Sequence, residues 1–121
     1  MPRILIIDDE PLVRSALRQM LERAGYEILD APDGKTAMDL IQHESTDLVI
    51  TDILMPEKDG IETIIEMRRE FPEIKIIAMS GGGHIGPENY LHVAKRLGVV
   101  RTFNKPIEMK RLLAAVGEAL G

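Results

Sequence analysis

The sequence contains no cysteine and no tryptophan, and only two tyrosines and two phenylalanines in 121 residues. The absence of cysteine excludes a disulfide framework, a thiolate-bound zinc site and a cysteine nucleophile. The scarcity of aromatic side chains leaves no stacking platform for single-stranded nucleic acid. The apolar runs are too short for a membrane-spanning helix or a signal peptide, so we expect a cytoplasmic protein without membrane insertion.

The chain also has fewer basic than acidic residues. Lys and Arg total 15 against 20 Asp and Glu, which gives a formal net charge of -5. A net acidic domain has no electrostatic reason to bind nucleic acid by itself. The composition is 45% hydrophobic and 29% charged, which is typical of a globular chain, and the length predicts one domain over residues 1–121.

Short apolar runs alternate with amphipathic segments along the whole chain. We predict buried strands at residues 4–7, 26–31, 48–51, 74–79 and 99–103. Helices are predicted from Pro11, after Gly34, after Gly60, around residues 90–97 and from Met109. The first helix is predicted to bury one face, made of Leu12, Val13, Ala16, Leu17, Met20 and Leu21. Such alternation favours a parallel sheet covered on both faces, that is, a five-stranded doubly wound α/β domain.

Polar residues stand where four of these strands end. They are Asp8 and Asp9 on the first strand, Asp52 on the third, Ser80 on the fourth and Lys105 on the fifth. Each one alone could simply cap the following helix. Together they would meet at one edge of the sheet, where clustered carboxylates repel one another and favour a bound cation. Oxygen donors suit a hard ion such as Mg²⁺, and an acid, a metal, a lysine and a hydroxyl suit phosphoryl transfer.

These residues resemble the receiver domain of two-component response regulators over essentially the full length of the chain. The matching motifs are Asp8-Asp9, the stretch 52–56 followed by Asp59-Gly60, Ser80 before a small residue, and Lys105-Pro106. The resemblance implies the flavodoxin-like, CheY-like (βα)5 fold with strand order 2-1-3-4-5. It also implies a phosphoacceptor signalling domain, which promotes its own phosphorylation, rather than an enzyme acting on a separate substrate.

The resemblance assigns a role to each residue of the site. Asp52 would be the phosphoacceptor, taking a phosphoryl group from a phosphohistidine. Lys105 would pair with Asp52 and later with a phosphoryl oxygen. Ser80 would donate its hydroxyl to another phosphoryl oxygen and draw the following loop inward, which would change partner binding.

The metal ligands follow from the same resemblance. Asp9 and Asp52 would bind Mg²⁺ directly, and the backbone carbonyl of Leu54 would complete the protein ligands. Asp8 would act largely through water.

Partners are likewise implied by the family. The phosphodonor would be a sensor histidine kinase or a histidine phosphotransfer protein, and the signal would pass to a downstream protein or output domain. A stand-alone regulator and a piece of a longer one both fit, and a phosphorylation-dependent dimer is compatible. The last helix and the region 90–97 are the expected contact surfaces.

Two features depart from the family pattern. Receivers usually carry an aromatic residue three positions before the lysine, where this chain has Thr102. Phe103 follows, and strand alternation predicts that it packs in the core on the other face. The glycine-rich stretch 81–87 formally contains G-x-G-x-x-G, but it follows the fourth strand and meets Pro87, so we interpret it as a loop rather than a dinucleotide site.

Three other functions share parts of this pattern. A small flavoprotein would need a phosphate cradle after the first strand, where Asp8-Asp9-Glu10 would repel the phosphate. A metal-dependent phosphatase would want a second acid two residues after Asp52, where Leu54 stands. A receiver fold kept only for binding would not need the complete set of acids.

Overall fold

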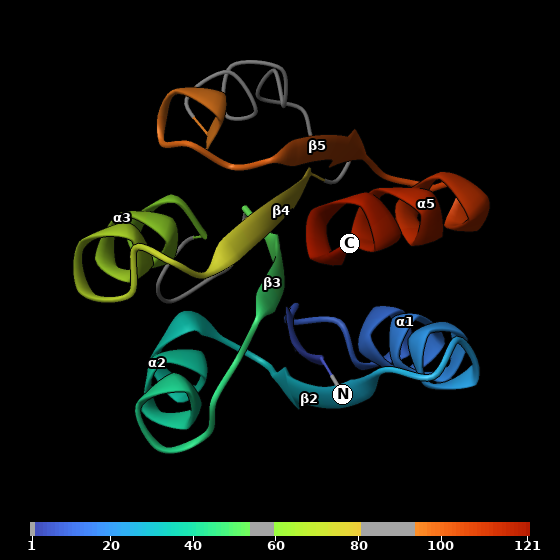
Figure 1. The fold of residues 1–121 in the computed structure, drawn as a ribbon, viewed down its shortest axis with the longest axis horizontal. Coiled ribbons are helices and arrows are strands. Elements are labelled where there is room, and N and C mark those ends of the chain that lie inside the picture. Colours follow the sequence, from blue (N-terminus) through green and yellow to red (C-terminus); the bar gives the residue numbers. More distant parts are fainter. Residues whose placement is uncertain (1, 54–59, 81–93) are drawn as a thin grey trace.

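The fold is one parallel sheet of five strands in the order β2-β1-β3-β4-β5, as the computed structural model in Figure 1 shows. The structure describes residues 2–53, 60–80 and 94–121. The strands are β1 (Arg3–Ile7), β2 (Glu27–Ala31), β3 (Leu48–Asp52), β4 (Lys75–Ser80) and β5 (Arg101–Asn104). The predicted fold class and strand order are therefore confirmed.

Helices cover both faces of the sheet. They are α1 (Pro11–Arg23), α2 (Gly34–His43), α3 (Gly60–Glu70) and α5 (Met109–Leu120). In Figure 1, α1 and α5 lie on one side of the sheet and α2 and α3 on the other. Of the helix predicted around residues 90–97, residues 94–97 fall within the described part of the chain, and 94–96 are helical.

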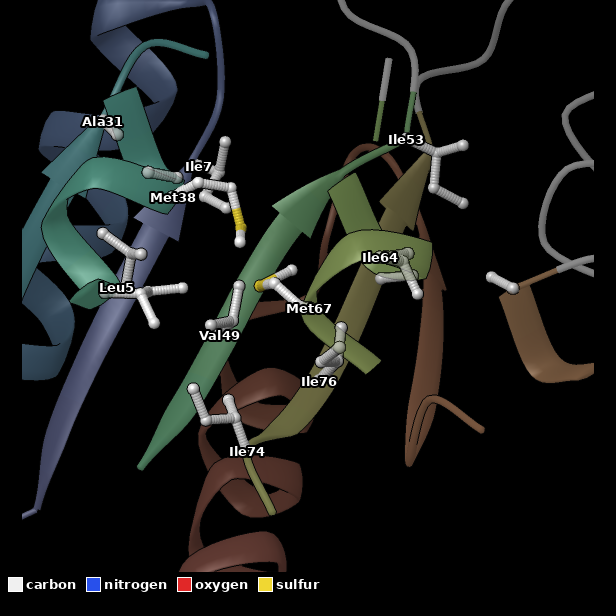
Figure 2. Close-up of a cluster of buried hydrophobic side chains, with 14 residues drawn as sticks. Leu5, Ile7, Ala31, Met38, Val49, Ile53, Ile64, Met67, Ile74 and Ile76 are labelled. Atoms are coloured by element: carbon white, nitrogen blue, oxygen red, sulfur yellow. The ribbon is translucent and has the colours of Figure 1, made fainter. Parts of the chain in front are cut away.

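Each strand sends alternate side chains into two separate cores. Leu5, Val49 and Ile76 pack toward α2 and α3, where they meet Met38 and Met67 (Figure 2). Their neighbours along the strands pack toward α1 and α5, and these are Ile4, Ile6, Leu48, Ile50, Ile77 and Met79. Burial on both faces explains why the central strands are continuous apolar runs rather than alternating ones.

The buried face of α1 is narrower than predicted. Leu17 and Leu21 are buried, whereas the side chain of Leu12 is 85% exposed. Successive residues of a helix are rotated by about 100°. Over the nine positions from Leu12 to Leu21 the rotation leaves Leu12 on roughly the opposite side of the helix from Leu21. The prediction was wrong for Leu12, which the helix directs away from the sheet, and for Ala16, which lies one turn later on the same side and is also exposed.

A side-chain cap fixes the start of α2, and removing it provides a test of the fold. The Asp33 carboxylate accepts a hydrogen bond of 2.7 Å from the Thr36 backbone N–H, which lowers the pKa of Asp33. Asp33→Ala should reduce the free energy of unfolding by about 1 kcal/mol in urea titrations at neutral pH. Because the pKa of Asp33 is lower in the folded state, the ionised carboxylate stabilises the fold at pH values above the pKa of the unfolded state. The difference in stability between the wild type and Asp33→Ala should therefore shrink as acid protonates Asp33.

The matched control is Glu108→Ala at the start of α5. Within the described part of the chain, the Glu108 side chain makes no cap hydrogen bond. An equal loss of stability in the two variants would contradict the assigned role of the Asp33 cap.

Candidate functional site

Lys105 brings three strand ends together. Its Nζ lies 2.7 Å from Asp8 Oδ2, after β1, and 3.3 Å from Asp52 Oδ2, at the end of β3. A third carboxylate, on Glu10, lies 3.6 Å from the same nitrogen. The backbone N–H of Lys105 donates to the carbonyl of Ser80 at 2.7 Å, which sets the lysine beside the end of β4. Polar groups from successive strands therefore meet at the carboxyl edge of the sheet.

Burial makes these charges strongly interdependent. Asp8 is fully buried, Asp52 is 4% exposed and the Lys105 side chain is 15% exposed. Burial by itself lowers the pKa of Lys105, but the hydrogen bond that Lys105 donates to Asp8 and the charges of Asp52 and Asp8 more than offset it, so the pKa is raised. The ammonium thus stays charged at neutral pH, and its stabilising effect is lost only when pH rises through the raised value.

The turn after β1 gathers further acids. Carboxylate oxygens of Asp8, Asp9 and Glu10 lie within 4.8 Å of one another, with Asp8 buried and the other two exposed. One lysine cannot neutralise this group together with Asp52. A surplus of negative charge on oxygen donors fits a hard divalent cation such as Mg²⁺. Sequence reasoning counted Glu10 in the acidic stretch after the first strand but not among the site residues, although its position directly after the two aspartates was a usable signal.

Ser80 is buried as the last residue of β4, the strand next to β3. In the register of these strands Asp52 pairs with Met79, so Ser80 lies one residue farther along the same edge. Leu54 and the glycine-rich stretch 81–87, which were also predicted to take part, lie outside the described residues.

The backbone around Asp52 is fixed from several sides. The Thr51 hydroxyl donates to the Asp52 carbonyl at 2.9 Å, and the Ile53 N–H donates to the Met79 carbonyl at 2.9 Å. The Gly60 N–H donates to the Ile53 carbonyl at 2.6 Å. A Cβ atom at Gly60 would overlap the Asp52 carbonyl oxygen. Sequence reasoning read Gly60 as a turn residue and missed this close approach.

Thr102 and Phe103 face opposite sides of the sheet. Thr102 pairs with Ala78, which belongs to the core under α2 and α3, and Phe103 pairs with Met79, which belongs to the core under α1 and α5. Phe103 is partly buried against the latter core, as predicted. Threonine therefore stands on the face where receivers usually place their switch aromatic.

Comparisons with known proteins identify the family of the chain. The model of the response regulator receiver domain family matches residues 4–117. The chain is 31% identical over 118 residues to sporulation initiation phosphotransferase F of Bacillus subtilis, covering 98% of this chain and 93% of that protein. It is 32% identical over 120 residues to the DNA-binding transcriptional regulator NtrC of a Bradyrhizobium species, covering 97% of this chain and 24% of that regulator.

Solved structures give the same result. A CheY-like response regulator receiver domain protein from Methanospirillum hungatei matches with a TM-score of 0.89 and 27% identity, over 99% of this chain and 94% of that one. The fold and the site define a signalling domain of two-component systems. The chain belongs to the response regulator receiver domain family.

Membership in this family indicates the general function of the chain. Receiver domains are signalling domains in which a phosphoacceptor role is typical, and they generally bind Mg²⁺ at an acidic pocket. Their partners are histidine kinases and output domains. Among the helices described in this structure, none has the length and apolar character needed to cross a membrane.

The close approach at Gly60 yields a test of how Asp52 is held. Gly60→Ala should destabilise the fold by about 1–3 kcal/mol in urea titrations, because the new methyl group forces the Asp52 peptide to move. Gly117→Ala on α5 is the matched control, since a Cβ there meets no described atom within 4 Å.

Gly117→Ala should instead stabilise by about 0.5–1 kcal/mol, the usual gain from glycine to alanine in a helix. Shifts of the same sign in the two variants would show that Gly60 is not in tight contact with Asp52.

Proposed function

We propose that residues 1–121 form a single receiver domain that accepts a phosphoryl group from a phosphohistidine onto Asp52 in a Mg²⁺-dependent reaction. The observation that carries this proposal is the contact of the Lys105 ammonium with two buried carboxylates, Asp8 and Asp52. A structural ion pair would need only one acid. A second buried acid beside the same lysine is a group available for chemistry.

Each residue has a distinct part in the transfer. A carboxylate oxygen of Asp52 forms the new bond to phosphorus as the bond from phosphorus to the histidine nitrogen breaks, and the imidazole leaves. Lys105, already 3.3 Å from that carboxylate, pairs with a phosphoryl oxygen as the Asp52 charge is consumed. The Ser80 hydroxyl donates to a second phosphoryl oxygen.

The acid turn, which consists of Asp8, Asp9 and Glu10, supplies part of the metal site in this proposal. Asp9 and Asp52, with the backbone carbonyl of Leu54, would hold Mg²⁺ directly, and Asp8 would act mainly through water. When bound, the ion neutralises charge on the phosphoryl oxygens. The surplus of carboxylate charge around Lys105 supports this assignment.

In this proposal, the effect of phosphorylation on partner binding passes through the loop after Ser80. Phosphorylation adds about −1.5 to −2 charges at one point, which is enough to bias a two-state element. Ser80 is buried at the end of β4, and its neighbour across the strand pair, Asn104, is directly followed by Lys105. Because Thr102 offers no aromatic ring, the serine is the link from the phosphoryl group to the partner-binding surface.

The acceptor role is tested by incubating the protein with Mg²⁺ and a small-molecule phosphodonor and measuring the intact mass. We expect the wild type to gain one phosphoryl group and Asp52→Asn to gain none. Asp39→Asn, an exposed aspartate on α2, is the matched control and should react like the wild type. Phosphorylation of Asp52→Asn to the wild-type extent, or of the wild type equally well without Mg²⁺, would contradict the proposal.

In this proposal the protein that carries the phosphohistidine docks on an apolar groove. It has a volume of about 690 Å³ and runs between α1 and the start of α5. Lys105 and Glu10 line one part of it, and Leu12, Val13, Ala16 and Met109 line much of the rest. Lys105 contacts Asp52 and also lines this groove, so a protein that presents a phosphohistidine to Asp52 would lie close to the groove. The first helix therefore joins the last helix as a contact surface.

The substitution Leu12→Asp tests docking of the phosphodonor protein separately from the chemistry at Asp52. Its side chain is 85% exposed, so the fold should be unaffected, but a charge would disfavour an apolar partner surface. We expect transfer from a phosphorylated histidine phosphotransfer domain to slow about tenfold, the effect of losing about 1.4 kcal/mol of contact. Phosphorylation by the small-molecule donor should remain at the wild-type rate.

Ile65→Asp is the matched control, because Ile65 is 45% exposed on α3, away from the groove. Equal slowing in both variants, or slowing of the small-molecule reaction by Leu12→Asp, would place the docking surface elsewhere.

A further inference from the structure

Arg14, one turn into α1, reaches back to the acid turn. Its Nη1 donates a hydrogen bond of 2.6 Å to the backbone carbonyl oxygen of Asp8. Its Nε lies 3.7 Å from Asp30 Oδ1 on β2, and its side chain is only 18% exposed. The guanidinium therefore lies between a strand carboxylate and the peptide that joins Asp8 to Asp9.

This peptide lies past the end of the strand pairing. The parallel registers of β1 with β2 and β3 end at Ile7. Beyond it, the Asp8 N–H donates to the Ala31 carbonyl at 3.2 Å, and the Asp8 carboxylate accepts from the Glu10 N–H at 2.9 Å. These two bonds hold the Asp8 amide and side chain. The bond from Arg14 holds the carbonyl, and so fixes the plane of the peptide that leads to Asp9.

Two features of the acid turn make the contact from Arg14 important for its conformation. Its three carboxylates lie within 4.8 Å of one another and repel. Within the described residues the Glu10 side chain makes no cap hydrogen bond to α1, so the usual way of fixing a helix start is missing here. A guanidinium bond to a backbone carbonyl is charge-assisted and well directed.

We propose that Arg14 is a positioning residue for metal binding: it locks the Asp8–Asp9 peptide so that the Asp9 carboxylate is presented beside that of Asp8. Asp30 orients Arg14 from the neighbouring strand. This inference rests on the proposed Mg²⁺-dependent function. Groups that orient metal ligands commonly change metal affinity by about 10- to 100-fold when they are lost.

Arg18 provides an unusually close control. Its Nη1 lies 2.7 Å from Asp30 Oδ2, and its Nε pairs with Glu22 at 3.3 Å. Arg18 thus shares the Asp30 partner of Arg14 and lies one turn along the same helix, but its described contacts are with Asp30 and Glu22 rather than with the Asp8 carbonyl. Any effect of general ion pairing on α1 should appear in Arg18→Met as well as in Arg14→Met.

The experiment is a titration of each protein with Mg²⁺ alone, followed by calorimetry and by ¹H–¹⁵N NMR. We expect Arg14→Met to bind Mg²⁺ about tenfold more weakly than wild type, and Arg18→Met to bind within twofold of wild type. Before any Mg²⁺ is added, the Asp9 amide resonance should move in Arg14→Met and stay in place in Arg18→Met. Arg14→Lys, which keeps a donor and a charge, should recover part of the affinity.

Equal Mg²⁺ affinities in folded Arg14→Met and Arg18→Met would overturn this inference, because wild-type binding would then not depend on the Asp8 tether. If Arg14→Met does not fold, Arg14→Lys carries the test: wild-type affinity together with an unmoved Asp9 resonance overturns it. A wild-type protein that binds no Mg²⁺ overturns the proposed function itself, and this inference with it.

Discussion

The contact of one ammonium with two buried carboxylates governs the rest of this site. Asp8 and Asp52 are almost entirely shielded from water, and burying an unpaired carboxylate is strongly unfavourable. Lys105 makes their burial tolerable, and it does so from the end of β5, an edge strand of four residues. The same contact therefore joins the first, third and fifth strands and leaves the edge of the sheet with more negative than positive charge. That surplus is what makes a divalent cation a fitting addition.

The first helix, α1, contributes to the site in three ways. It begins at the acid turn, directs Leu12 outward beside the groove, and directs Arg14 inward to the Asp8 carbonyl. Its buried residues, Leu17 and Leu21, anchor it on the sheet. A partner that lies on the groove would thus contact the element that also holds the metal-binding turn. In the proposed function, docking and chemistry would be adjacent because both would involve the first two turns of one helix.

Much of this architecture follows from local patterns. The apolar runs predicted all five strands, and the polar residues that end them predicted the edge of the sheet where Asp8, Asp52 and Lys105 meet. The strand order came from the family resemblance, since spacing along a chain does not determine which strands lie side by side. Leu12 was misassigned because periodicity does not show where a helix leaves the sheet. Gly60 and Arg14 act through contacts with distant backbone atoms, and such contacts exist only after the chain has folded.

The most direct test of the central claim is a crystal structure of the protein with Mn²⁺ in place of Mg²⁺, with the ion located by its anomalous scattering. The account predicts one ion ligated by Asp9 and Asp52, with Lys105 still within hydrogen-bonding distance of Asp52. An ion bound only by the exposed acids of the turn, with Asp52 not coordinating it, would contradict the account.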